Sequence, residues 1–304
     1  MFDRGVPFTK MNGCGNDFIV VDNRDGLLNE VALSAFVQNV CRRGTSIGAD
    51  GFMLLENSSI ADFKMRYFNA DGSEGEMCGN GARCMSRFAY HIGAAKTKMS
   101  FETMAGIYQA ELNQNGVKVK FPDVQLQALK LNQPYEWDGP SGVYHYGVVG
   151  VPHTVWFVKN VFAIADDQLR EWGRMVRNDQ QQFPNGTNVN FVELIDRQTL
   201  RIRTYERGVE AETYACGSGS TAAAIIAGIL GHVDTSVNLL TRGGPLQISY
   251  HLTDDAAESV YLEGNSKLVA EGHLLPDAWT TNKTQDDIFK GLEWGEINER
   301  SNHS

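Results

Sequence analysis

One short frame of cysteine and glycine occurs twice in this chain, and no other feature limits its possible folds as strongly. The segment "EMCGNGARC" places Cys78 directly before Gly79, and "YACGSGSTA" places Cys216 directly before Gly217. Each frame follows an alternating pattern that predicts a β-strand, "FKMRYFN" in the first case and "LRIRTYE" in the second. We therefore expect one strand–turn–helix unit twice, and an internal duplication that gives two similar α/β halves.

The residues after each cysteine predict a helix. In the first case the apolar residues have the spacing i, i+3, i+4 and i+7 and are Met85, Phe88, Ala89 and Ile92. Gly93 is a suitable stop. In the second case residues 221–230 are apolar on all sides, which is typical of a fully buried helix, and Gly231 ends it. Short β patterns such as 116–124 and 142–158 dominate the remainder.

The position of the repeats divides the chain. A weaker echo pairs "NDFIVVD" with "NFVELID", both of which are rich in β-forming residues. We place the first half at residues 1–123 and the second at 124–265. Residues 278–304 form a polar appendage whose apolar patch comprises Ile288, Phe289, Leu292 and Trp294.

Composition excludes several classes of protein. The formal net charge of −10 argues against nucleic acid and against an anionic membrane as partners, because both require a basic surface. The N-terminal stretch lacks the pattern of a signal peptide, and no apolar run approaches the length of a membrane span. Five cysteines are an odd number and are thinly spread over 304 residues, which disfavours a disulfide framework. We expect a reduced, cytoplasmic protein.

The two cysteine turns suggest acid–base chemistry. A cysteine at the start of a helix lies near unpaired backbone N–H groups and the positive end of the helix dipole. We therefore expect a lowered pKa for the thiols of Cys78 and Cys216. The same N–H groups can hold a carboxylate, and glycine lets a ligand approach the backbone. Two such turns face to face could remove a proton from one side of a carboxylate-bearing carbon and return one to the other.

Cysteines can also serve in packing, in metal binding or in disulfides. A single cysteine is more often a packing residue than a catalytic one, and we assign that role to Cys41 and Cys84. Cys14, beside a polar turn in "NGCGND", stays a candidate for lining the site. The spacing rules out a zinc site, because there is no C-x2-C and no pair of histidines at i and i+4. A disulfide between Cys78 and Cys216 is expected only on oxidation.

A dinucleotide-binding fingerprint is the sharpest rival. The residues Gly217, Gly219 and Ala222 fit G-x-G-x-x-A between a strand and a helix. No convincing acidic residue follows about 20 positions later. The fingerprint also leaves the cysteine and the duplicated turn unexplained, so we prefer the acid–base interpretation.

At this level of detail the chain resembles a known family. The segments "FTKMNGCGNDFIVVD", "YFNADGSEGEMCGNGARC", "GTNVNFVE" and "YERGVEAETYACGSGS" are similar, in order and in approximate spacing, to the motifs of diaminopimelate epimerases. The resemblance extends from about residue 8 to residue 275. It implies an enzyme without a cofactor or a metal that interconverts LL- and meso-diaminopimelate for lysine and peptidoglycan synthesis.

The resemblance also implies an architecture. It predicts two pseudo-symmetric α/β halves, each a curved mixed sheet wrapped around a central helix, with the site in the cleft between them. The last strand, at about residues 266–277, is expected to return to the first half. We further expect a homodimer.

The resemblance assigns site residues by position. Cys78 and Cys216 match the acid–base pair, and the turns that hold the reacting carboxylate match Gly79, Asn80, Gly217 and Ser218. Asn16 matches a polar residue near the reacting centre. The residues that match the set binding the distal end of the substrate are Asn69, Asn188, Glu206 and Arg207. His153 is a possible further member.

Two departures from the family pattern stand out. The chain has "GVPH" at 150–153 where the family commonly has G-N-P-H, so Val151 replaces an asparagine that would bind the distal end. The approach to the second turn is also one residue longer than the shortest family form. The first departure keeps open one rival, an epimerase of another amino acid. Two further rivals are an isomerase on the same fold that uses carboxylates, which the two intact cysteine turns disfavour, and an amino-acid-binding protein without catalysis.

Overall fold

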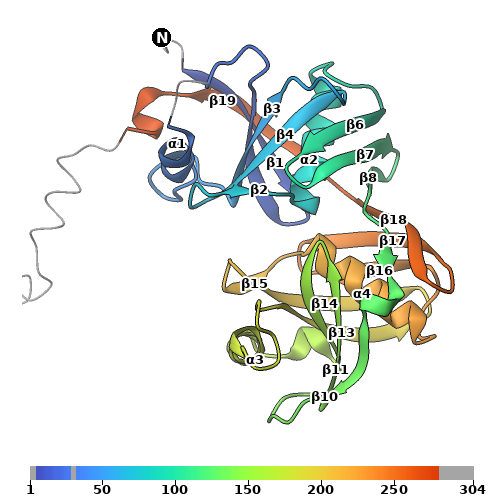
Figure 1. Cartoon of the computed structure of the whole chain (residues 1–304). Helices are drawn as coiled ribbons and strands as arrows, with labels where there is room; N and C mark the ends of the chain where they lie inside the picture. The colour runs from blue at the N-terminus through green and yellow to red at the C-terminus, as the bar shows by residue number, and fades with distance from the viewer. Residues whose placement is uncertain (1–4, 29–31, 281–304) are drawn as a thin grey trace, which may run out of the picture.

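The computed structural model of the chain describes residues 5–28 and 32–280. Two bodies lie one above the other in Figure 1, and the chain passes between them twice. The blue-to-teal body contains the first cysteine turn, and the green-to-orange body contains the second. The predicted apolar patch of the appendage, around residues 288–294, lies outside the described residues.

The first body is a curved mixed sheet. Its strand pairs are antiparallel for β1–β2, β3–β4, β4–β5, β6–β7 and β7–β8, and parallel for β2–β3 and β4–β6. The strands are β1 Val6–Gly13, β2 Asn16–Asp22, β3 Gly51–Glu56, β4 Phe63–Asn69, β5 Glu74–Gly75, β6 Lys98–Thr103, β7 Gly106–Asn113 and β8 Gly116–Lys120.

The second body repeats this topology strand for strand. The pairs β11–β12, β13–β14, β14–β15, β16–β17 and β17–β18 are antiparallel, and β12–β13 and β14–β16 are parallel. The strands are β11 Val143–Val149, β12 Val151–Phe157, β13 Asn188–Asp196, β14 Thr199–Glu206, β15 Ala211–Thr213, β16 Ser236–Thr241, β17 Gly244–Leu252 and β18 Ala256–Gly264. This shared order agrees with the duplication expected from the two cysteine frames.

Further strand pairings join the bodies and complete their edges. Strand β18 pairs antiparallel with β8 of the first body, and also with the short β9 (Val124–Gln125). Strand β10 (Lys130–Pro134) completes the edge of the second body by pairing with β11. In the same way β19 (Lys267–Leu274) pairs with β1 and completes the first body. The division into halves near residues 123 and 265 stays a prediction.

Each sheet curves around one long helix. Helix α2 (Gly79–His91) lies in the first body and α4 (Gly217–Ile229) in the second, as Figure 1 shows. Helix α4 starts four residues before the predicted 221, because the helix begins at the cysteine cap itself. Both helices belong to one apolar core that extends through the two bodies. Burial of apolar area in this core provides the main driving force for folding.

Two other connections form helices that were not predicted from the sequence. Helix α1 (Leu33–Val40) lies between β2 and β3, and α3 (Asp166–Asn178) lies between β12 and β13. Each covers the outer face of its own sheet and builds a separate apolar cluster there. The 3-10 turns are Leu126–Ala128, Val161–Ala163 and Pro276–Ala278. No helix among the described residues is long and apolar enough to cross a membrane.

Candidate active site

The two cysteines cap the two central helices in the same way. Cys78 and Cys216 have extended backbones, and each thiol sulfur accepts a hydrogen bond from the backbone N–H three residues later. The Sγ–N distance is 3.4 Å to Gly81 in the first turn and 3.4 Å to Gly219 in the second. Both thiols therefore lie where a helix begins and where its dipole favours negative charge.

The starts of the two helices meet at Gly79 and Gly217. A Cβ atom built on Gly79 would lie 3.8 Å from the Gly217 Cα, and one built on Gly217 would lie 3.7 Å from the Gly79 Cα. Both would also lie within about 3.1 Å of Leu262 Cδ2. A side chain at either position would crowd Leu262 and fill the space between the helix starts, so glycine favours this close approach. As a result the two cysteine turns face each other, and the charge of Cys78 acts on Cys216.

The expected lowering of the thiol pKa values is wrong for these turns without a ligand. Burial raises the pKa of Cys78 to about 11, and the nearby Glu206 carboxylate adds to the rise. Burial and Glu206 also raise the pKa of Cys216 well above its ordinary value. The N–H groups of Gly81 and Gly219 oppose this change. They do not overcome it, because removing a thiolate from water costs more than two long N–H···S bonds return.

Asn80 connects the two halves beside the thiols. Its side-chain Nδ2 donates to the backbone carbonyl of Ala215 at 2.8 Å, directly before Cys216. The same nitrogen donates to Oδ1 of Asn16. Asn16 in turn donates to Asp50 Oδ2 at 3.2 Å. The structure thus brings Asn16 and Asn80 together beside the second cysteine turn.

Three residues assigned to the distal end lie together in the second half. Asn188 Oδ1 accepts a hydrogen bond of 2.8 Å from the Arg207 backbone N–H, and its Nδ2 donates to the Pro152 carbonyl at 3.1 Å. The Arg207 guanidinium donates to the carbonyl of Asn185 at 2.6 Å. Glu206, next in the chain, accepts from the Thr213 hydroxyl. Burial raises the pKa of Glu206, and the Cys216 thiol opposes this rise, which places the carboxylate beside that thiol.

His153 lies in the same region and is fully buried. Its Nδ1 lies 3.3 Å from Asn190 Nδ2, while its Nε2 has no hydrogen-bond partner among the described residues. Burial and the positive charge of Arg207 lower the pKa of His153 to about 3. The imidazole is therefore neutral at physiological pH, and it can donate or accept one hydrogen bond in the site.

Asn69, which the resemblance assigns to the distal end, lies in the first half. It ends β4, where its Oδ1 accepts from the Tyr67 hydroxyl at 2.9 Å and its Nδ2 donates to Ser73 Oγ at 3.0 Å. Burial raises the pKa of Tyr67, and the charges of Cys78 and Glu206 raise it further. Tyr67 therefore lies within reach of groups from both halves. Tyr67 was not predicted from the sequence, although its position in the strand that carries Asn69 was the available signal.

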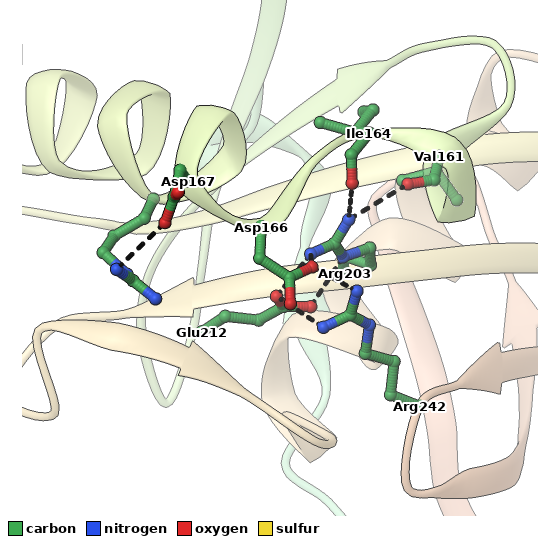
Figure 2. A network of polar contacts seen from close by, with 8 residues as sticks. Val161, Ile164, Asp166, Asp167, Arg203, Glu212 and Arg242 are labelled. Carbon is green, nitrogen blue, oxygen red and sulfur yellow. Dashed lines mark hydrogen bonds and ion pairs between the residues drawn. The ribbon is translucent and has the colours of Figure 1, made fainter.

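A buried arginine supports the strand that carries Glu206. The Arg203 guanidinium donates to Glu212 at 2.7 Å and to Asp166 at 2.7 Å, and Arg242 donates to the same two carboxylates, as Figure 2 shows. Glu212 lies on β15 beside Thr213, which holds Glu206. The cluster thus fixes the short strand that leads to Cys216.

The three other cysteines do not cap the central helices. Cys14 is in the turn between β1 and β2, with its sulfur 3.9 Å from the backbone carbonyls of Pro245 and Asn265. Burial raises the pKa of both Cys41 and Cys84 to about 12, in line with a packing role. Among the described residues, no three side chains of His, Cys, Asp or Glu are grouped to hold a metal ion.

Comparison with known sequences gives a consistent result. A family model described as diaminopimelate epimerase matches residues 8–126 and 146–269. A protein of Aquifex aeolicus named diaminopimelate epimerase is 42% identical over 282 residues, which cover 88% of this chain and 98% of that protein. One of the same name from Archaeoglobus fulgidus is 41% identical over 280 residues, covering 88% and 96%.

Solved structures confirm the fold. A phenazine biosynthesis protein of the PhzF family from Bacillus anthracis has a TM-score of 0.69 at 18% identity, covering 90% of this chain and 99% of that one. A hydroxyproline epimerase from Agrobacterium vitis has a TM-score of 0.67 at 16% identity, covering 90% and 94%. At this level of identity the likeness concerns the fold alone, and it confirms the predicted pair of α/β halves.

Proposed function

The chain belongs to the diaminopimelate epimerase family, and from this premise we propose that it interconverts LL- and meso-diaminopimelate without a cofactor. The observation that carries the proposal is the pair of cysteine-capped helices whose first glycines, Gly79 and Gly217, touch. A carbon held between these turns would have one thiol on each side. Inversion of a stereocentre by two bases requires this arrangement.

The proposed reaction moves one proton at each face of the α-carbon. One thiolate takes the α-proton, and the pair of electrons left on carbon is delocalised into the adjacent carboxylate. The opposite thiol then gives its proton to the other face, so the enzyme ends with its protonation states exchanged. Backbone N–H groups of Gly79, Asn80, Gly217 and Ser218 are assigned to the carboxylate, where preorganised donors stabilise the charge that develops.

The raised thiol pKa values set a condition on this reaction. Cys78 and Cys216 are predominantly protonated in the empty site at neutral pH. The bound substrate brings an α-ammonium group next to the sulfur atoms, and an opposite charge at such a distance favours the thiolate. We therefore propose that the basic thiolate forms chiefly after the substrate has entered, in a site closed to water.

The distal end of diaminopimelate carries its own ammonium and carboxylate groups. Arg207 suits the carboxylate, because a guanidinium matches it with two parallel hydrogen bonds. Glu206 suits the ammonium, and Asn69 and Asn188 add amide groups. The contact of Asn188 with the Arg207 backbone supports the grouping of these two residues. His153 Nε2 is a further candidate donor, whereas the Val151 side chain offers no polar group.

We also propose the setting in which the enzyme acts. Its reaction belongs to the synthesis of lysine and of peptidoglycan, in the cytoplasm, and the protein forms a homodimer. Light scattering at several concentrations tests the dimer. A molar mass that stays at one chain would reject it.

An epimerase of another amino acid is the second candidate, and Val151 is the observation that favours it. The experiment that separates the two measures deuterium uptake at the α-carbon from D2O, on LL-diaminopimelate and on amino acids without distal charges such as leucine and histidine. We expect exchange and inversion on diaminopimelate alone. Faster exchange on a monocarboxylate would favour the second candidate, and no exchange on any of them would indicate a binding protein.

A further inference from the structure

Arg83 is a buried cation whose charge has no carboxylate partner. It lies on α2, five residues after Cys78, and it has no exposed surface. No carboxylate of the described residues lies within ion-pair distance of its guanidinium, although many other arginines of the chain make such pairs. Its Nε also has no hydrogen-bond partner among these residues. A charge buried in this way is costly unless the site uses it.

Arg83 donates its hydrogen bonds to residues of the first cysteine turn. Its Nη1 donates to the Gly79 carbonyl at 3.2 Å, and its Nη2 donates to Asn80 Oδ1 at 2.7 Å. The second bond orients the Asn80 amide so that Nδ2 reaches Ala215 in the other half. On the other side the guanidinium packs against β18, where a Cβ on Gly264 would lie 3.1 Å from Nε. Arg83 is therefore held rigidly behind the turn.

The second turn has no such charge. The residue five positions after Cys216 is Thr221, whose hydroxyl donates to the Gly217 carbonyl at 3.0 Å. Like the bond from Arg83 to Gly79, this bond goes to the carbonyl of the first residue of the helix, but its donor is a neutral hydroxyl. The duplicated turns thus share a hydrogen bond and differ in one positive charge.

Several charged and titratable groups surround the two thiols and change their pKa values. Arg83 favours the thiolate of Cys78, whereas Glu206 on β14 opposes it. Burial, the Glu206 carboxylate and the charge of Cys78 all raise the pKa of Cys216. Tyr67 on β4 and Cys84 on α2 also feel the charge of Cys78. Since burial raises the pKa of Cys84 to about 12, Cys84 does not compete with Cys78 for the proton loss.

We propose that Arg83 is a positioning residue that makes Cys78 the first of the two thiols to lose its proton as the pH rises, so that Cys216 remains the proton donor of the pair. The inference rests on the proposed function for its catalytic meaning. The ionisation order itself can be measured without substrate. The two duplicated turns would then differ in the order in which their thiols ionise.

The test is a pH titration of protein labelled with 13C at the cysteine β-carbon, followed by NMR, with the two signals assigned from Cys78→Ser and Cys216→Ser variants. The carbon shift reports ionisation whether or not a reagent can reach the sulfur. We expect the Cys78 signal to begin titrating at a lower pH than the Cys216 signal. In Arg83→Gln the Cys78 titration should move upward by about one pH unit, because one neighbouring cation has been removed.

A matched control lies one turn further along the same helix. Arg87 donates to the Ser266 carbonyl at 2.5 Å, so its hydrogen bond leads to the connection between β18 and β19 and not to Gly79 or Asn80. Arg87→Gln removes the same charge from α2 and should leave the Cys78 titration in place. Arg83→Lys keeps the charge but loses the fork that holds Asn80, so it should keep the titration of Cys78 and lower kcat.

The outcomes separate this inference from the proposed function. Titration of Cys216 before Cys78 in the unmodified protein overturns the inference, even if Arg83→Gln fails to fold. An unchanged Cys78 titration in a folded Arg83→Gln variant also overturns it. The expected order together with no α-proton exchange on any substrate would keep the inference and reject the epimerase proposal.

Discussion

Arg66 on β4 and Arg203 on β14 occupy the same place in the two halves, three residues before Asn69 and Glu206 respectively. Each arginine pairs with a glutamate of the following short strand, Glu74 in the first half and Glu212 in the second. The Arg66 side chain is 25% exposed, whereas that of Arg203 is fully buried. The same ion pair is thus a surface contact in one half and an interior one in the other.

The cysteine turns differ in a similar manner. Their backbones agree, because the close contact of the two helix starts depends on glycine and on the cap geometry. Their side chains differ, since Arg83 corresponds to Thr221 and Asn69 corresponds to Glu206. The proposed substrate is inverted at one carbon and extends from it in one direction. The two turns at that carbon should therefore have the same backbone, whereas the charged side chains around it should differ between the halves. The comparison indicates that duplication supplied the first requirement and divergence the second.

The largest expected effect is on catalysis by the two thiols. Cys78→Ala and Cys216→Ala should each lower kcat/KM for LL-diaminopimelate by at least about 100-fold, because each removes one partner in proton transfer. Circular dichroism provides the control for folding. Substantial turnover by either variant would show that the reaction does not need one thiol from each half.

Oxidation should link the two halves at the same point. Because the helix starts touch, Cys78 and Cys216 should form a disulfide when a mild oxidant is added to the substrate-free protein. Activity should be lost and then restored by a reductant. Peptide mapping of the inactive protein checks the link, and its absence would contradict the proposed proximity or mobility of the thiols.

Substitutions of Arg66 and of Arg203 should have different effects on the stability of the protein. Arg203→Met removes the buried partner of Glu212, which keeps its bond to the partly exposed Arg242, and should lower the free energy of unfolding by up to about 3–5 kcal/mol. Arg66→Met removes a partly exposed contact and should lower it by about 1 kcal/mol or less. Urea denaturation measures both. Equal effects would show that the difference in burial has no energetic consequence.

The distal end should depend on the second half. Arg207→Ala removes the proposed partner of the distal carboxylate and should raise KM for LL-diaminopimelate by about tenfold or more, because bonds to charged groups are the strong ones. The control is Arg177→Ala, which breaks a pair with Glu210 on the same side of the protein. A similar rise in KM for both variants would assign the effect to structure and not to binding.

The smallest effect is expected at Val151. Val151→Asn restores one amide that the family commonly has, and one neutral hydrogen bond is worth about 1 kcal/mol, or roughly fivefold in binding. We expect KM for diaminopimelate to stay the same or to fall by no more than this factor. A large rise in KM would instead show that the site has adapted to an apolar side chain at position 151.

Much of the fold could be predicted from local sequence. The strand β2 falls on "NDFIVVD", and helix α2 follows the spacing of Met85, Phe88, Ala89 and Ile92. Helix α1 was missed because it has only eight residues, and α3 because Gly173 interrupts its sequence, although there the glycine is the residue that packs against the Tyr205 ring. Contacts of that kind are tertiary and leave no local pattern.

The sequence predicted where the two cysteines lie, at the starts of helices, but not the pKa values of their thiols. The direction of the thiol pKa shift could not be predicted, because the N–H donors are visible in the sequence and the depth of burial is not. Tyr67 and Arg83 escaped notice for a related reason. Each looks like an ordinary strand or helix residue until the other half of the molecule surrounds it.

The return of β19 to β1 has a consequence for synthesis of the protein. Val6 pairs with Leu274, so a ribosome must complete nearly the whole chain before the first sheet can acquire its edge strand. Until then β1 presents unpaired N–H and C=O groups, which other chains can bind. Closing so long a loop is also slow. During translation the nascent first half is therefore the stage at which this enzyme is most exposed to aggregation, and the stage at which a chaperone would protect it most.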